Sequence, residues 1–264
     1  MGREIEQVNV NGIEMRYSCF GEGPKTMVII PGLSLIPVMT FAGFIAEAYK
    51  AFNDEFTVYV FERRENMPES YTVWDMARDT AEVMKYLGLS DICLFGTSQG
   101  GMIAQCISIE YPELVKKMVL GSTVSKILSV GEEGALGRWL RLAEEGKLHE
   151  LNMDFSETVY SKETFEKSKE GIIALEGLIT PRDLKRFIIL SRGTDGFDLT
   201  GELSRIKCPT LLIGSKKDKV FSVERMKETV EGINCESFFY EDYSHVVYDE
   251  APDYKERLLK FFRD

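Results

Sequence analysis

Ser98 lies at the centre of a G-x-S-x-G pattern, between Gly96 and Gly100. An apolar run at 91–95 precedes the pattern, as expected of a strand buried on both faces, and helically spaced apolar residues follow it at 102–109. A serine on a sharp strand-to-helix turn exposes its hydroxyl, and neighbours without a Cβ let the strand and helix pack closely. The pattern therefore predicts a nucleophilic serine that attacks carbonyl carbon.

A serine hydroxyl is a weak nucleophile at neutral pH, so Ser98 needs a general base. The chain has two histidines. His149 lies in a polar stretch typical of an exposed helix, and we interpret it as a surface residue. His245 lies in a turn between a strand-like run at 237–240 and an amphipathic helix expected from Pro252 to Phe262. We therefore predict that His245 is the base.

A histidine base also needs an acid that orients its ring. Asp218 follows Pro209–Gly214, a run typical of a buried parallel strand. The carboxyl ends of parallel strands are where open α/β sheets collect their functional groups, so Asp218 is the predicted acid. Three further aspartates are alternatives that do not follow a core strand; they are Asp195, Asp198 and Asp242.

Ser98, Asp218 and His245 occur in the chain order nucleophile, acid, base, which is that of the α/β-hydrolases and not of the chymotrypsin or subtilisin types. The chain resembles the α/β-hydrolase superfamily over nearly its whole length. The features that carry the resemblance are this order, the G-x-S-x-G turn at 96–100, the strand and turn at 28–33, and the terminal pattern at 243–252. The resemblance implies an α/β-hydrolase fold, with a mostly parallel central sheet, helices on both faces and a helical cap insertion.

The resemblance also implies an oxyanion hole of two main-chain N–H groups, which stabilise the negative oxygen of a tetrahedral intermediate. One group belongs to the residue after the nucleophile, which is Gln99. The other belongs to the loop after the third strand and maps onto Leu33. Many members of the family have His-Gly in that loop, whereas this chain has Pro31-Gly32.

The rest of the chain supplies the elements that must position these residues. Two opening strands, 4–10 and 13–19, are joined by Asn11-Gly12, a hairpin signal. Strands and helices alternate afterwards, which predicts a parallel sheet with right-handed crossovers. Between 122 and 205 the pattern is helical and no convincing strand appears. We therefore predict two units, which are an α/β-hydrolase core of residues 1–121 and 206–264 and a helical cap of residues 122–205.

The composition is typical of a cytoplasmic enzyme. No apolar run approaches the roughly 20 residues of a membrane span, and the polar start lacks a secretory signal. The five cysteines show no C-x-x-C spacing, which favours reduced thiols, and we expect no metal and no other cofactor. A net charge of −11 repels nucleic acid and anionic lipid surfaces, so the expected partner is a small-molecule substrate. The sequence leaves the oligomeric state open.

These residues predict a serine hydrolase that forms an acyl-enzyme at Ser98, with His245 moving the proton and Asp218 holding the imidazole. An insertion rich in aromatic and aliphatic residues makes an apolar pocket, so we expect a small, mostly apolar ester or lactone as substrate. The cap residues that we expect to line this pocket are Phe155, Tyr160 and Phe197.

Other functions stay open, because a fold does not fix a function. Enzymes that hydrolyse carbon-carbon bonds of diketone-like ring-cleavage products are similar in triad and cap, and perhydrolases and lyases also occur on this scaffold. A small-molecule receptor on a hydrolase scaffold is an alternative of another class, which slow or absent turnover would reveal. Dehalogenases of this superfamily carry an aspartate where this chain has Ser98, and no early G-x-G-x-x-G indicates a nucleotide-dependent dehydrogenase.

Overall fold

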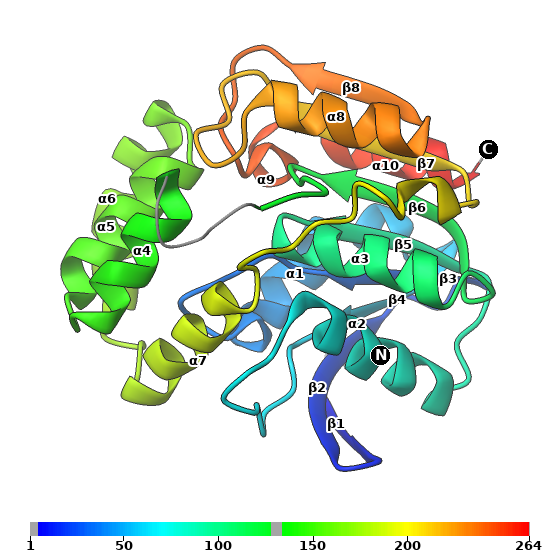
Figure 1. The fold of residues 1–264 in the computed structure, drawn as a ribbon, viewed down its shortest axis with the longest axis horizontal. Helices are drawn as coiled ribbons and strands as arrows, with labels where there is room; N and C mark the ends of the chain where they lie inside the picture. The colour runs from blue at the N-terminus through cyan, green and yellow to red at the C-terminus, as the bar shows by residue number, and fades with distance from the viewer. Residues whose placement is uncertain (1–4, 128–133, 264) are drawn as a thin grey trace.

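The computed structural model describes residues 5–127 and 134–263. Within them, eight strands form one sheet in the order β1-β2-β4-β3-β5-β6-β7-β8 (Figure 1). The strands are β1 Ile5–Val10, β2 Ile13–Phe20, β3 Lys25–Ile30, β4 Phe56–Phe61, β5 Ile92–Thr97, β6 Val115–Gly121, β7 Thr210–Ser215 and β8 Glu236–Tyr240. Residues 1–4, 128–133 and 264, which the predicted core and cap include, lie outside the described residues.

The hairpin expected at the start of the chain is confirmed. Asn11 and Gly12 have φ values of 51° and 77°, and two consecutive residues with positive φ are what a tight hairpin turn requires. β1 pairs with β2, and β2 with β4, in antiparallel register, whereas the other neighbours are parallel. The fold is therefore the predicted α/β-hydrolase fold, a mostly parallel sheet with an antiparallel hairpin at one edge.

Helices cover both faces of the sheet because its central strands are apolar on both sides. In β3, Val28 and Ile30 belong to the apolar cluster under one face, and Met27 and Ile29 to the cluster under the other. The first cluster includes residues of α2, α3 and α8, and the second includes residues of α1 and α10 (Figure 1). These helices are α1 Ala42–Ala48, α2 Val73–Tyr86, α3 Gln99–Glu110, α8 Val223–Ile233 and α10 Tyr254–Arg263.

Among the described residues, four α-helices lie between β6 and β7, to one side of the sheet (Figure 1). They are α4 Gly134–Glu144, α5 Leu148–Val159, α6 Lys162–Glu176 and α7 Pro181–Arg192. Three of them contribute to a separate apolar cluster around Trp139, Leu151 and Phe187, which also takes in Leu35 and Val246 from outside the predicted cap. The helices of this segment therefore pack on the loops that carry the candidate site.

Four short helices complete the described elements, and they are η1 Val38–Phe41, η2 Lys50–Phe52, η3 Leu203–Arg205 and α9 Val247–Glu250. Among the described residues, no helix has both the length and the apolar composition that crossing a bilayer demands.

Candidate active site

Ser98 occupies a strained turn between β5 and α3. Its φ of 51° and ψ of −123° are rare for a residue with a side chain, and such conformations persist only where the surroundings enforce them. Two hydrogen bonds do so here. The Ser98 N–H donates to the Gly121 carbonyl at 2.8 Å, and the Thr123 hydroxyl donates to the Ser98 carbonyl at 2.7 Å. The neighbouring strand end thus holds both sides of the turn.

The glycines around Ser98 are required by close backbone contacts. A Cβ on Gly96 would lie 2.4 Å from the Gly100 carbonyl oxygen, and a Cβ on Gly100 would lie 1.9 Å from the Ile30 oxygen. Both distances are shorter than any real contact, and the backbone atoms of the packed strand and helix cannot move aside. The loop after β3 is also close, because a Cβ on Gly32 would lie 2.9 Å from the Ser98 Cβ.

Asp218 and His245 are joined directly. The His245 Nδ1 lies 2.8 Å from the Asp218 Oδ2, and the two side chains are 4% and 0% exposed. Asp218 follows β7, and its other oxygen accepts the N–H groups of Val220 and Phe221 at 2.7 and 2.9 Å. These bonds fix the carboxylate, which in turn favours the tautomer with a proton on Nδ1 and leaves Nε2 available as a base.

The loop that carries His245 is tied to the end of α5. The Ser244 hydroxyl donates to the Thr158 carbonyl at 2.9 Å, and the Val246 N–H donates to the Val159 carbonyl at 3.1 Å. The residues on either side of His245 are therefore anchored to the inserted helices, which links the position of the imidazole to the position of α5.

The alternative candidates have other partners. Asp242 is 78% exposed and forms an ion pair with Lys217 at 2.6 Å. Asp198 pairs with Lys126 at 2.6 Å, and Asp195 is exposed. His149, on α5, is 62% exposed and lies 2.9 Å from the Glu176 carboxylate. The structure thus brings Asp218, and not these aspartates, to the His245 ring.

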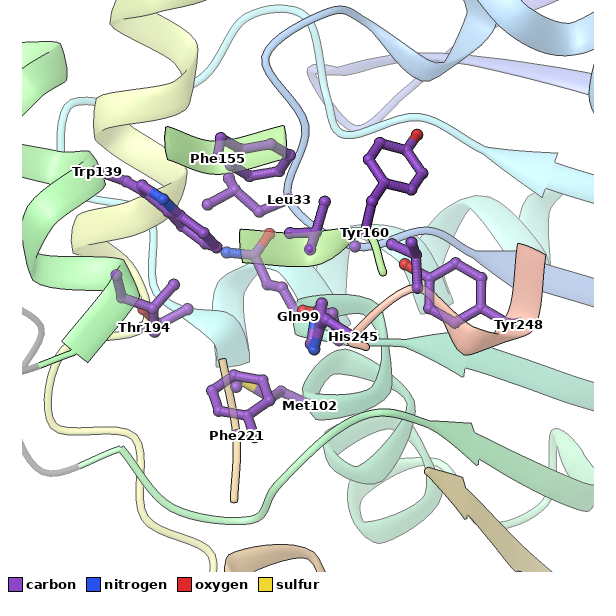
Figure 2. Close-up of a pocket in the computed structure, with 15 residues that line it drawn as sticks. Leu33, Gln99, Met102, Trp139, Phe155, Tyr160, Thr194, Phe221, His245 and Tyr248 are labelled. Carbon is purple, nitrogen blue, oxygen red and sulfur yellow. The ribbon is translucent and has the colours of Figure 1, made fainter. Parts of the chain in front are cut away.

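Ser98 and His245 line one pocket of about 100 Å³ (Figure 2). The pocket also includes Gly32, Leu33 and Gln99, so both segments expected to form the oxyanion hole border the nucleophile. Gln99 is the first residue of α3, and the first N–H groups of a helix have no acceptor within it. This arrangement brings the predicted nucleophile, a histidine held by a carboxylate, and the two segments expected to supply main-chain donors to one small space.

The three cap residues expected in the pocket differ in position. Phe155, in the second half of α5, and Tyr160, which follows the helix, are among the residues that line the pocket (Figure 2). Phe197 is not among them. It is 5% exposed and belongs to the large apolar cluster beneath the sheet face that α2 and α3 cover. The structure therefore does not bring Phe197 to the pocket.

A buried charged cluster beside the pocket was not anticipated from the sequence. Arg63, 4% exposed, donates from Nη2 to the Pro31 carbonyl at 2.7 Å and lies 3.4 Å from the Gln99 side-chain oxygen. Glu62, 2% exposed, pairs with Arg186 of α7. Burial lowers the pKa of the Arg63 guanidinium to about 10, and the Glu62 carboxylate opposes this shift. The only sequence signal was the place of these charges, directly after a core strand.

Comparisons with known proteins agree with this geometry. A family model described as alpha/beta hydrolase fold matches residues 25–252. The chain is 24% identical over 221 residues to the serine hydrolase BPHL of Homo sapiens. The aligned region covers 80% of this chain and 69% of that protein. The crystal structure of the enol-lactonase from Burkholderia xenovorans LB400 has a TM-score of 0.84 at 19% identity, and covers 98% of this chain and 100% of that one.

An esterase from Exiguobacterium antarcticum matches over 100% of both chains, with a TM-score of 0.81 at 20% identity. At about 20% identity, these solved structures show only that the fold is shared. The family model spans most of the chain and therefore shows family membership. The chain belongs to the α/β-hydrolase family, and it is a hydrolase.

Proposed function

We propose that this hydrolase cleaves an ester or lactone through an acyl-enzyme at Ser98. The observation that carries the proposal is the bond between His245 and the fully buried Asp218 side chain, with His245 and Ser98 lining the same pocket. A carboxylate, a histidine and a serine in this relation are the parts that activate a hydroxyl for attack on carbonyl carbon. The relatives that are named esterase, enol-lactonase and serine hydrolase support the same class of reaction.

In the first half of the reaction, the Ser98 oxygen bonds to the carbonyl carbon while its proton passes to the His245 Nε2. The carbonyl oxygen becomes an oxyanion, which accepts the N–H groups of Gln99 and Leu33. The bond to the leaving alcohol then breaks as His245 returns the proton to it. Asp218 stabilises the imidazolium that exists between these two transfers.

In the second half, water adds to the acyl carbon and gives its proton to His245. The bond to Ser98 breaks, the serine regains the proton, and the free acid leaves. Every group required is supplied by the side chains and main chain described above. The pocket favours apolar substrates, since Met102, Trp139, Phe155 and Phe221 contribute to its walls.

We also propose that the enzyme works in the cytoplasm, a location that its five free cysteines favour.

A fluorophosphonate probe tests this proposal. Phosphonylation of wild-type protein is expected at Ser98, mapped by peptide mass spectrometry, and no adduct is expected in Ser98→Ala. An adduct on another residue, or none on freshly prepared wild type, would contradict the assignment. A panel of ethyl esters, lactones and diketones then identifies the bond that is cleaved, and turnover of diketones alone would favour carbon-carbon hydrolysis instead.

A further inference from the structure

A second, larger cavity adjoins the catalytic pocket. It has a volume of about 550 Å³ and lies between the loop after β3, helix α1 and helices α5 and α6. Its walls are mostly apolar. We call it the α1–α6 groove, and its defining residues are Ile36, Phe44, Ile45, Ala48, Ile172 and Leu175.

The groove is continuous with the space around Ser98. Five residues line both cavities, and they are Gly32, Leu33, Phe155, Tyr160 and Tyr248. Figure 2 shows Tyr160 and Tyr248 on one side of the small pocket, opposite Trp139 and Thr194, which line the small pocket and are not among the groove residues. The groove therefore begins where the oxyanion loop meets the end of α5, next to the reacting serine.

The two spaces differ in what they can hold. Pockets for drug-sized ligands have volumes of about 300 to 1,000 Å³, a range that includes the groove and excludes the small pocket. At about 100 Å³ the small pocket has room for only a few non-hydrogen atoms. A substrate that fills both must have one small group and one large group on the two sides of its carbonyl carbon.

Exposed apolar side chains stand at the rim of the groove, together with the exposed Asp249, which pairs with Lys255. Phe44 on α1 is 78% exposed, and Leu175 at the end of α6 is 37% exposed. These are two of only six large apolar side chains that are exposed within the described residues, and both border this cavity. Apolar surface gathered at the mouth of an apolar groove indicates a binding site for a hydrophobic group.

The position of His245 decides which part of the substrate enters which space. The leaving alcohol must reach the His245 ring to receive its proton, and His245 lines the small pocket together with Phe221 and Val246. None of these three is among the described residues that line the groove. The alcohol therefore belongs in the small pocket, and the groove is left for the acyl chain.

We propose that the α1–α6 groove binds a long aliphatic acyl chain, so that the enzyme is selective for esters of a long-chain acid with a small alcohol. This inference rests on the proposed function and extends it to a substrate class. Burial of each added methylene group is expected to raise kcat/KM by up to about fourfold until the groove is full.

Two ester series of wild-type enzyme test the inference, both measured by acid release below the micellar concentration. Ethyl esters from acetate to dodecanoate vary the acyl chain, and acetate esters from ethyl to dodecyl vary the alcohol. We expect kcat/KM to rise at least about a hundredfold along the first series and to stay flat or fall along the second. A rise along the alcohol series, or a flat acyl series, would overturn the inference.

A blocked groove provides the matched test. Ala48→Trp places a large ring in the groove from an exposed position of α1, so folding should be little affected. It should lower the ratio of decanoate to acetate kcat/KM at least about tenfold. Glu47→Trp makes the same change one residue earlier, outside the described lining, and should leave this ratio at the wild-type value.

A small methyl fluorophosphonate separates the two ways of failing. If it labels Ser98 and the acyl series is flat, the groove inference is wrong while the serine hydrolase proposal stands. If it labels nothing and no ester is hydrolysed, both are wrong. An equal fall of the decanoate to acetate ratio in Ala48→Trp and Glu47→Trp would also count against the groove.

Discussion

The Arg63 guanidinium donates a hydrogen bond of 2.7 Å to the Pro31 carbonyl and thereby holds the loop that faces Ser98. Proline has no N–H, so its carbonyl is the main-chain group through which this loop can be anchored at that residue. The next residue, Gly32, lies against the Ser98 Cβ, and Leu33 supplies the second proposed oxyanion donor. The position of that donor therefore depends on a side chain from the end of β4.

We predict that Arg63→Met lowers kcat on the order of a hundredfold, because a shift of about 1 Å in an oxyanion donor has that effect. The change in KM should be smaller, since the donor acts mainly on the transition state. The Glu62 and Arg186 pair balances its own charge, so the variant should fold. Steady-state kinetics on an ethyl ester measure both constants.

Arg63→Lys is the matched variant, since lysine keeps a cationic donor on a long, flexible side chain. It should recover part of the lost kcat and part of the labelling rate with fluorophosphonate. Equal kcat values for wild type and Arg63→Met would show that the loop holds its position without this bond.

The acid of the site gives a second prediction. Asp218→Asn should lower kcat by about 10⁴, as replacement of the triad acid does in a serine protease, because an amide favours the wrong tautomer of the histidine. Circular dichroism should show an unchanged fold. Asp242→Asn is the control, because that side chain is 78% exposed and pairs with Lys217, and its kcat should stay close to wild type. The reverse order of effects would move the acid to Asp242.

The sequence was sufficient for the fold and for the bond between Asp218 and His245 because local rules govern both. A buried strand ends at Ser215, the chain turns within three residues, and the carboxylate is placed at the sheet edge where the parallel strands end. The same rule positions Ser98 after β5. Sequence order and strand topology therefore bring these residues together without any knowledge of side-chain packing.

Arg63 and Phe197 show what local patterns cannot determine. The charges at 62–65 have the composition of a solvated turn. Glu62 is nevertheless buried, because it pairs with Arg186, which is 124 residues away in the chain. Phe197 is an aromatic residue of the inserted segment, as Phe155 is, yet it packs into the core beneath the sheet. The direction of a side chain is set by tertiary packing, which periodicity alone does not specify.

This contrast gives the third prediction. Phe155→Ala removes a ring that lines both cavities and lies 4.6 Å from the Trp139 ring, so it should change the preference among acyl chains, by up to about fourfold in kcat/KM for each methylene that is gained or lost. Phe197→Ala should keep the wild-type preference while lowering the free energy of unfolding by about 3 to 5 kcal/mol. The ethyl ester series and urea unfolding measure the two effects. Identical preference profiles for Phe155→Ala and wild type would remove Phe155 from the site.

Alkaline stability is the subject of the last prediction. Burial raises the pKa of four tyrosines well above 10, and they are Tyr49, Tyr71, Tyr248 and Tyr254. Above a pH of about 10 the unfolded chain loses tyrosyl protons that the native protein keeps, so the unfolded state binds fewer protons and the free energy of unfolding falls as the pH rises. Arg63 has a lowered pKa, so this one group makes the free energy of unfolding rise with pH and opposes the effect of the four tyrosines. The contribution of these four tyrosines to the free energy of unfolding should therefore be constant from about pH 8 to about pH 10. Above about pH 10 the free energy of unfolding should decline.

Tyr254→Phe isolates one of these groups. The Tyr254 hydroxyl is buried and has no hydrogen-bond partner among the described residues, so its removal should raise the free energy of unfolding by about 1 kcal/mol at neutral pH. The alkaline decline should also become shallower, because one fewer buried phenol must stay protonated. Tyr240→Phe is the control, since it loses a bond of 2.8 Å to Asp253 and should be destabilised by about 1 kcal/mol. Urea unfolding across the alkaline range measures all three proteins, and a Tyr254→Phe variant less stable than wild type would mean that the hydroxyl has a partner that stabilises the fold.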